Sequence, residues 1–245
     1  MLVGSSDSSK IVYNAVAQNH NVSRVIEDTP IPLSKFLKRR IKKLGLFTVV
    51  GQILFMVYNK YLFRKSKERI SVIKEKYKLS TENFPKQIFS KVPSINSSEA
   101  IKILQKENPD LVIVNGTRII SKKVLSSIDA LFINTHVGIT PEYRGVHGGY
   151  WALVNNDKKN CGVTVHVVDE GIDTGGVLYQ DTIEVNHQDN FNTYLYLQIA
   201  KAIPLINKAI TDFRNNEIKV QKRENNTSVL YSHPTLFQYI VNKVK

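Results

Sequence analysis

The sequence predicts an α/β protein with a doubly wound, mostly parallel sheet. Short apolar runs rich in β-branched residues, such as 111–114 and 130–134, alternate with longer amphipathic stretches. Such runs suit parallel strands buried on both faces, and the alternation of strand and helix is typical of this fold class. Polar residues follow both runs, where ligands of such sheets bind, beyond the carboxyl ends of the strands.

The first residues are predicted to form a β–α–β unit. Leu2-Val3-Gly4 ends a first strand, residues 10–19 form a short helix, and residues 22–26 form a second strand. The intervening turn, GSSDSS, is small and polar, so it is either a backbone phosphate site or a plain tight turn. It lacks the G-x-G-x-x-G spacing of dinucleotide-binding proteins, and both interpretations stay open.

Residues 33–80 are predicted to form a basic helical insertion, because Pro30 and Pro32 break the chain and the segment that follows holds little Gly or Pro. Residues 35–78 contain 14 Lys and Arg but only two acids, so they carry almost all of the net charge of +13. The apolar middle, residues 46–58, is shorter than the roughly 20 residues that span a bilayer.

Three roles for this insertion stay open. It is a helical hairpin packed on the core with a solvated basic face, or an interfacial element in peripheral contact with an anionic membrane, or a device that steers an anionic substrate. The hairpin is the simplest of the three.

The later elements continue the α/β pattern. Residues 97–106 form an amphipathic helix, and the runs 163–168 and 177–185 are strands that bracket a Gly-rich loop. Residues 189–215 are largely helical with an interruption at Pro204, and 217–220 with 229–231 form a small hairpin or a β extension. We therefore divide the chain into an α/β core, residues 1–185, and a C-terminal helix with a short β extension, residues 186–245. That extension either forms a homodimer surface or closes a substrate pocket.

Composition restricts the protein class further. With 42% hydrophobic residues in 245, the chain can bury a substantial core. Its single cysteine, Cys161, allows no disulfide within the chain and is expected to be a buried spectator in a reducing compartment. The first residues lack the charged and apolar regions of a secretory signal, so a cytoplasmic location is expected, with the inner face of the membrane left open.

Asn134, His136 and Asp173 are the candidate catalytic residues. Asn134 and His136 are two positions apart at a strand end, so their side chains share a face, and Asp173 lies in the Gly-rich loop that can fold over them. An amide, an imidazole and a carboxylate suit acyl transfer to an amine, which needs an oxyanion donor and groups that move protons. A metal site is not expected, because the His and Asp spacing fits no zinc pattern.

The segments NTHVGITPEYRGVHGGYWAL and GVTVHVVDEGIDTGGVLYQ together resemble the folate-dependent formyltransferase family. The resemblance covers residues 87–184, with weaker similarity over 1–28. It places Asn134, His136 and Asp173 on the catalytic triplet of that family, with Asn134 as the oxyanion donor. How the proton work divides between His136 and Asp173 is left open. His166 is interpreted as a hydrogen-bonded structural residue.

The resemblance also implies the formyl donor, 10-formyltetrahydrofolate, without a metal. Its pterin is expected between residues 115–120 and 168–172, largely against backbone groups. The candidate donor-binding residues are Thr117, Arg118, Ile119, Ile120, Val168, Asp169 and Glu170.

Within the family, the loop after His136 looks most like the nucleotide-sugar N-formyltransferases of O-antigen and lipopolysaccharide biosynthesis. The implied acceptor is a nucleoside diphosphate carrying a 4-amino-4,6-dideoxyhexose. The candidate acceptor residues follow the Asn-x-His pair: Tyr143, Arg144, Gly145, His147 and Trp151. Aromatic rings stack on sugars and bases, and Arg pairs with phosphates. Trp151 is equally suited to begin a helix that faces the core.

Other functions are kept as alternatives. The first is a phosphoribosylglycinamide formyltransferase of purine synthesis, and the second is a non-catalytic protein that binds folate or a nucleotide sugar. Hydrolysis of the formyl donor would use the same triplet. Nucleic acid is not expected as a partner, because 61 residues after position 184 are too few for the C-terminal barrel of the methionyl-tRNA enzymes.

Overall fold

The computed structural model describes residues 1–221 and 228–242. Within them, seven strands form one sheet in the order β3-β2-β1-β4-β5-β7-β8. The first five, β1 (Leu2–Val3), β2 (Val25–Asp28), β3 (Phe89–Val92), β4 (Leu111–Asn115) and β5 (Leu131–His136), are parallel. The last two, β7 (Gly162–Val167) and β8 (Val177–Thr182), are antiparallel to their neighbours. The predicted doubly wound, mostly parallel sheet is confirmed.

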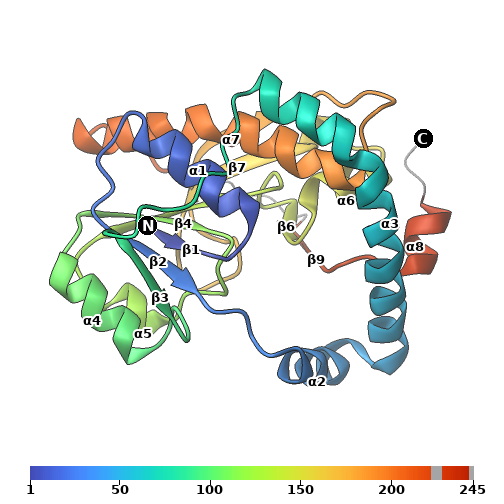
Figure 1. Cartoon of the computed structure of the whole chain (residues 1–245), viewed down its shortest axis with the longest axis horizontal. Helices are drawn as coiled ribbons and strands as arrows, with labels where there is room; N and C mark the ends of the chain where they lie inside the picture. The colour runs from blue at the N-terminus through green and yellow to red at the C-terminus, as the bar shows by residue number, and fades with distance from the viewer. Residues whose placement is uncertain (222–227, 243–245) are drawn as a thin grey trace.

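Helices cover both faces of this sheet (Figure 1). One face carries α1 (Asp7–Ala17), α7 (Phe191–Arg214) and the later part of α3 (Leu46–Lys76), and the other carries α4 (Ser98–Glu107) and the short α5 (Lys122–Leu125). Successive residues of β5 point to opposite faces, so Ile133 packs with the first group and Phe132 with the second. This two-sided burial explains the continuous apolar runs in the strands.

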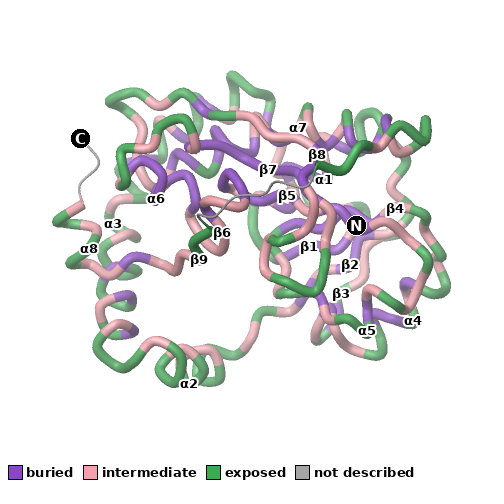
Figure 2. The backbone as a smooth tube through the Cα atoms, turned by 180° about the vertical axis from the view of Figure 1, so that it is seen from behind, coloured by how far each residue is buried: buried purple, intermediate pink, exposed green. Residues whose placement is uncertain are grey.

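The basic insertion is two helices, α2 (Leu33–Leu44) and α3, which meet at Gly45. The C-terminal half of α3 packs on the core through Ile70 and Ile73. By contrast, none of the residues of α2 is buried, and it lies apart from the sheet (Figures 1 and 2). The insertion is thus helical as predicted, but only part of it packs on the core.

The C-terminal region differs from its prediction in two ways. Helix α7 continues through Pro204 without interruption, because eleven of its residues are buried and this packing outweighs one lost backbone hydrogen bond. The expected hairpin does not form: β9 (Val229–Tyr231) pairs in parallel with β6 (Tyr143–Gly145), and Gln221 bridges Val177 instead. Residues 222–227, the turn of that hairpin, lie outside the described residues.

The remaining elements lie around β6. Helix α6 (Gly148–Val154) follows the loop after β6, a single 3-10 turn (Lys158–Asn160) leads into β7, and α8 (Leu236–Val241) packs beside α3. Cys161 is buried, as predicted, and burial raises its thiol pKa to about 12. It is therefore a neutral core residue near pH 7.

Candidate active site

The candidate site lies at the carboxyl end of β5, where the parallel strands end and the antiparallel ones begin. Asn134 and His136 occupy the same face of β5, as their spacing predicts. Asp173 comes from the loop between β7 and β8, and its backbone has φ of 52°, a left-handed conformation that Asp tolerates better than most residues. The loop thus returns the carboxylate to the strand end.

Asp173 contacts His136 directly. The distance from His136 Nδ1 to Asp173 Oδ2 is 3.3 Å, and the His136 side chain is only 5% exposed. The backbone amide of Gly145 donates to the same carboxylate oxygen at 3.0 Å. The structure therefore brings two of the three predicted catalytic residues into one hydrogen-bonded cluster and adds the backbone of β6 to it.

His136 has an acceptor at each ring nitrogen. Its Nε2 lies 2.7 Å from the carbonyl oxygen of Tyr143, on the other side of the ring from Asp173. Burial lowers the pKa of His136, although the charge of Asp173 opposes this. Burial thus favours the neutral ring, which has one proton for two acceptors, so only one of these two contacts is a hydrogen bond at a time.

Asn134 joins the cluster through His166, for which the sequence predicts only a structural role. Its Nδ2 lies 3.1 Å from His166 Nε2, and His166 Nδ1 lies 2.8 Å from the carbonyl of Val167. Since a carbonyl only accepts, Nδ1 of the neutral ring donates to it and Nε2 accepts from the Asn134 amide. His166 Nε2 is also 3.7 Å from Asp173 Oδ1.

His166 therefore belongs to the site. Asn134 and His166 are direct partners across the antiparallel β5–β7 pair. The alternating pattern of residues 163–168 was the available signal, but it does not give the register of β7 on β5.

Asp173 is held ionised by this cluster. Burial alone would raise the pKa of its carboxyl group, but the nearby His166 and His136 and the Gly145 amide together keep the pKa below its usual value. Asn134 and Asp173 are half-buried, whereas His136 and His166 are buried beneath them. A substrate at this edge would therefore meet the amide and the carboxylate first.

The two segments predicted to hold the donor lie side by side at the same edge. Lys122 Nζ forms an ion pair with Glu170 at 3.0 Å, linking the loop after β4 to the loop after β7. Val168 donates its amide to Phe132, and Asp169 holds its own loop through Gly171 and Thr174.

The loop after β4 presents an apolar side chain rather than a free charge. Arg118 is bound to Asp28 at 2.7 Å and to the carbonyl of Thr29, while Thr117 bonds within the loop. Ile120 is buried, but Ile119 is 55% exposed. An exposed isoleucine beside backbone-rich loops fits the flat face of a ring such as a pterin, whose polar edge can bond to backbone groups, better than a second anion.

Most of the predicted acceptor residues are buried or already bonded within the chain. The side chains of Tyr143 and Trp151 are buried; Tyr143 donates its hydroxyl to Asp157, and Trp151 donates to the carbonyl of Ser232. Arg144 donates to the carbonyl of Ile172, at 3.2 Å, so it holds the Asp173 loop. Gly145 has φ of 94° and supplies the amide that binds Asp173.

The C-terminal segment covers this loop. Tyr231 of β9 stacks between Tyr143 and Trp151, with ring centroids 5.3 and 5.2 Å away. His147 Nε2 lies 2.9 Å from His233 Nδ1. Burial lowers the pKa of both imidazoles, and the pair stays neutral near pH 7.

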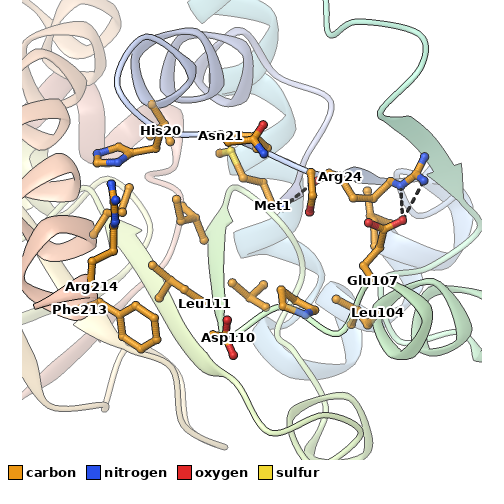
Figure 3. Close-up of a pocket in the computed structure, with 18 of the residues that line it drawn as sticks. Met1, His20, Asn21, Arg24, Leu104, Glu107, Asp110, Leu111, Phe213 and Arg214 are labelled. Atoms are coloured by element: carbon orange, nitrogen blue, oxygen red, sulfur yellow. Dashed lines mark hydrogen bonds and ion pairs between the residues drawn. The ribbon is translucent and has the colours of Figure 1, made fainter. Parts of the chain in front are cut away.

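A separate cavity of about 450 Å³ lies at the amino ends of β1, β2 and β4 (Figure 3). It is lined by Met1, Leu111 and the Arg24–Glu107 ion pair, among others. It is at the opposite edge of the sheet from Asp173, where α/β sheets do not place their ligands. Among the described residues, no group of three or more His, Cys, Asp or Glu is arranged to hold a metal ion.

Comparison with known proteins gives a family and a fold. A family model described as formyl transferase matches residues 55–202. A methionyl-tRNA formyltransferase of Finegoldia magna is 32% identical over 139 residues, which are 56% of this chain and 44% of that protein. The chain thus spans less than half the length of this curated relative.

Two solved structures share the fold. One is an N-formyltransferase from Helicobacter canadensis in complex with folinic acid and dTDP-3-aminofucose, with TM-score 0.54, 17% identity, and coverage of 94% of this chain and 69% of that one. The other is glycinamide ribonucleotide transformylase 1 from Symbiobacterium toebii, with TM-score 0.58, 17% identity, and coverage of 94% of each chain.

Proposed function

The chain belongs to the formyl transferase family, and we propose that it transfers a formyl group from 10-formyltetrahydrofolate to the amine of a nucleoside-diphosphate-linked amino sugar. The observation that carries the formyl-transfer part is the cluster of Asn134, His136 and Asp173 at the carboxyl end of β5. The donor supplies an activated formyl group. Everything else in the reaction is positioning and proton transfer by the chain's own residues.

Asn134 is the proposed oxyanion donor. Its amide is half-buried and, in the resting site, its hydrogen bond goes to His166. Turning toward a bound formyl oxygen would exchange this hydrogen bond for one to the developing negative charge. One donor of this kind accelerates acyl transfer by about 10²–10³.

Asp173 is the proposed proton acceptor for the attacking amine, directly or through water. Its low pKa keeps it ionised, and its second oxygen is held by the amide of Gly145. His136 is better suited to hold Asp173 than to contact the amine, because both of its ring nitrogens already face acceptors. This division of labour refines the alternative that the sequence left open.

The donor is proposed to bind between residues 115–120 and 168–172, with Ile119 against the face of the pterin ring. The segments are adjacent, and their charged groups, Arg118 and Glu170, are already paired within the chain. The backbone groups of both segments would then contact the pterin. The side chains that keep this backbone in place are Thr117, Ile120, Val168 and Asp169.

An amino-sugar nucleotide is the proposed acceptor for two reasons. The fold is shared with an N-formyltransferase bound to dTDP-3-aminofucose, and the loop of residues 137–151 resembles that class. Moreover, Asp7 occupies the first turn of α1, where it pairs with Lys74 at 3.3 Å, so this helix N-terminus already holds an anion of the chain's own in the place where the phosphate of glycinamide ribonucleotide could bind. Roles in O-antigen or lipopolysaccharide synthesis, a cytoplasmic location and a homodimer remain predictions.

The test is a formyl-transfer assay that follows tetrahydrofolate release with a panel of acceptors. The panel holds dTDP-, GDP- and UDP-linked amino sugars, glycinamide ribonucleotide and methionyl-tRNA, and the variants are Asp173→Asn and, as a matched control, the exposed Asp129→Asn. We expect turnover with one amino sugar, lost in Asp173→Asn and kept in Asp129→Asn.

Each other outcome has a defined meaning. Turnover only with glycinamide ribonucleotide or methionyl-tRNA would overturn the acceptor class but not formyl transfer. Formate release without any amine would indicate hydrolysis. Folate binding without turnover would identify a non-catalytic binding protein.

A further inference from the structure

Helix α3 exposes an apolar stripe on the side that faces away from the core. Phe47, Val50, Leu54, Val57 and Tyr61 follow one another at spacings of three and four residues, so they lie on one face. All five are exposed, Phe47 by 92% and Val57 by 63%. Such a stripe normally faces a core, yet here the core-facing side is the opposite one.

The opposite side of α3 is fixed to the core by polar contacts. Gln52 donates to the carbonyl of His233 at 2.7 Å, Ser66 to Asn190 at 3.1 Å, and Asn192 to Asn59 at 2.9 Å. The apolar stripe therefore cannot turn inward without breaking all three contacts.

Helix α2 adds a second uncovered surface. Its apolar residues Leu33, Leu37, Ile41 and Leu44 share one face, and most of its Lys and Arg lie on the others. Leu33 and Ile41 are exposed, Leu37 and Leu44 are half-buried, and none of the residues of α2 is buried. Its packing is confined to one side, toward α3, and a helix of 12 residues with so little packing is marginally stable in water, so contact with a further surface would stabilise it.

The charge around these faces has one sign. Residues 33–67 contain ten Lys and Arg and no acid. Arg64 and Lys65 follow the stripe on α3, and the basic face of α2 precedes it. An apolar surface bordered only by cations complements a surface that is apolar inside and anionic outside, which describes an anionic bilayer.

The same charges disfavour the other occupants. A second copy of this chain on the same stripe would bring basic residues against basic residues, with no acid in the segment to pair with them. RNA would satisfy the cations but leave Phe47, Leu54 and Val57 in water.

We propose that α2 and the outer face of α3 form a peripheral docking surface for anionic membranes. The exposed Phe237, Ile240 and Val241 of α8, beside α3, extend the apolar surface. This inference does not depend on the proposed acceptor.

The helix lies in the interface rather than across the bilayer. By length and composition α3 is the one helix among the described residues that could cross a membrane, and 17% of its most apolar window is buried. However, the contacts of Gln52, Asn59 and Ser66 hold it along the folded core. A spanning helix would have to leave these partners behind.

The experiment is co-sedimentation of the full chain with vesicles of phosphatidylcholine alone or mixed with phosphatidylglycerol. We expect binding to the mixed vesicles, weakening as salt is raised, and little binding to phosphatidylcholine. Extraction at alkaline pH should release the protein, as for a peripheral protein.

Two sets of variants test the two components. Replacing Lys38, Arg39, Lys42 and Lys43 by Ser should weaken binding by about fivefold for each charge. The Phe47→Ser/Val57→Ser variant should weaken it by about tenfold or more. Matched controls are Lys102→Ser/Lys106→Ser/Lys123→Ser and Val220→Ser, which lie outside these helices and should bind as the wild type does.

Several results would overturn the proposal. These are no binding of the wild type to mixed vesicles, equal loss in the control variants, or resistance to alkaline extraction. Concentration-dependent dimers abolished by Leu54→Lys, or tRNA binding in place of vesicle binding, would assign the surface to another partner. Circular dichroism and formyl transfer by each variant show that its fold is intact.

Discussion

Asp173 depends on backbone as much as on side chains. Its left-handed conformation directs one oxygen to His136 and Gly145 and the other toward His166. A carboxylate held by a backbone amide and flanked by two buried imidazoles needs little reorganisation when a neighbouring amine loses its proton, which is how preorganised sites lower a barrier.

Removing the Asn134 amide should slow the reaction without unfolding the protein. We expect Asn134→Ala to lower kcat by about 10²–10³ with a small change in KM, because the lost hydrogen bond is strongest in the transition state. Steady-state kinetics measure this, with the exposed Asn215→Ala as the control. An equal loss in kcat/KM that comes only from KM would instead indicate a binding role.

The buried imidazoles should make stability depend on pH. The pKa values of His147 and His233 lie below the ordinary 6.5, mainly because of burial and also because each is near the other or near Arg40. Below pH 6.5 the two imidazoles therefore bind protons in the unfolded chain but stay neutral in the folded chain. Their stabilisation is fully present above pH 6.5 and is lost as the pH falls below it, by up to about 1.4 kcal/mol per pH unit for each residue.

Urea unfolding between pH 7.5 and about 5 tests this. The free energy of unfolding should fall with pH in the wild type, and less steeply in His147→Asn. Asn is the chosen replacement because His147 has φ of 58°, which Asn tolerates. A slope unchanged by the substitution would mean that other groups govern the dependence.

The parallel β6–β9 pair connects the C-terminal segment to the carboxylate of Asp173, the proposed proton acceptor. Gly145 is in β6, binds Asp173 through its amide, and lies against the carbonyl of Tyr231 in β9. A side chain at this position would displace β9, and that displacement would reach Asp173.

Two glycines provide a controlled test of this connection. Gly45 and Gly145 both have positive φ, but a Cβ at Gly45 meets no atom within 4 Å, whereas one at Gly145 would clash with Tyr231. Gly45→Ala should cost about 1 kcal/mol of unfolding free energy, from backbone conformation alone. Gly145→Ala should cost about 3 kcal/mol and lower kcat as well.

Chemical denaturation and the formyl-transfer assay separate the two effects. If Gly145→Ala resembled Gly45→Ala in both, β9 would not support the site.

What the sequence predicted at this level was local, and what it missed was not. The spacing of Asn134 and His136 and the alternation of residues 163–168 are properties of single strands. The roles of His166 and Tyr231 depend on which strands pair, across 32 residues for Asn134–His166 and across 88 for Tyr143–Tyr231. Periodicity gives the face of a strand but not its partner, so neither role could be predicted.

A buried ion pair connects the inserted helix α3 to the rest of the molecule. Arg69 of α3 forms two hydrogen bonds with Asp189, at 2.9 and 3.2 Å, and the Asp189 side chain is fully buried. This ion pair joins the insertion to the turn before α7, and so to the main core.

Removing Arg69 should therefore cost more than removing an ordinary surface charge. We expect Arg69→Met to lower the free energy of unfolding by about 3 kcal/mol, because it leaves a buried carboxylate without its cation. Adding Asp189→Asn should restore part of this loss. Thermal unfolding measures both, and the exposed Lys67→Met is the control; a double variant as unstable as the sum of the single variants would exclude direct coupling.

The overall architecture was predictable, but the surface of the insertion was only partly so. Its helices and its charge followed from the scarcity of Gly and the absence of Pro and acids between residues 33 and 67. The apolar run of 13 residues is shorter than the apolar part of α3 in the structure, because Leu62 and Phe63 continue it past Lys60. Which side of α3 would face outward depended on its tertiary contacts, chiefly those with α7 and α8.

The insertion leaves the sheet after β2 and returns at β3, and these two strands are parallel neighbours. The sheet thus sets where this crossover begins and ends, but not the make-up of its outlying part, residues 33–48, which contributes no buried side chain. Residues 33–48 can therefore be exchanged without a change in the register of β5 and β7, which carry the candidate site. If α2 and α3 dock on membranes as proposed, that docking and the chemistry of the site can therefore change independently of each other.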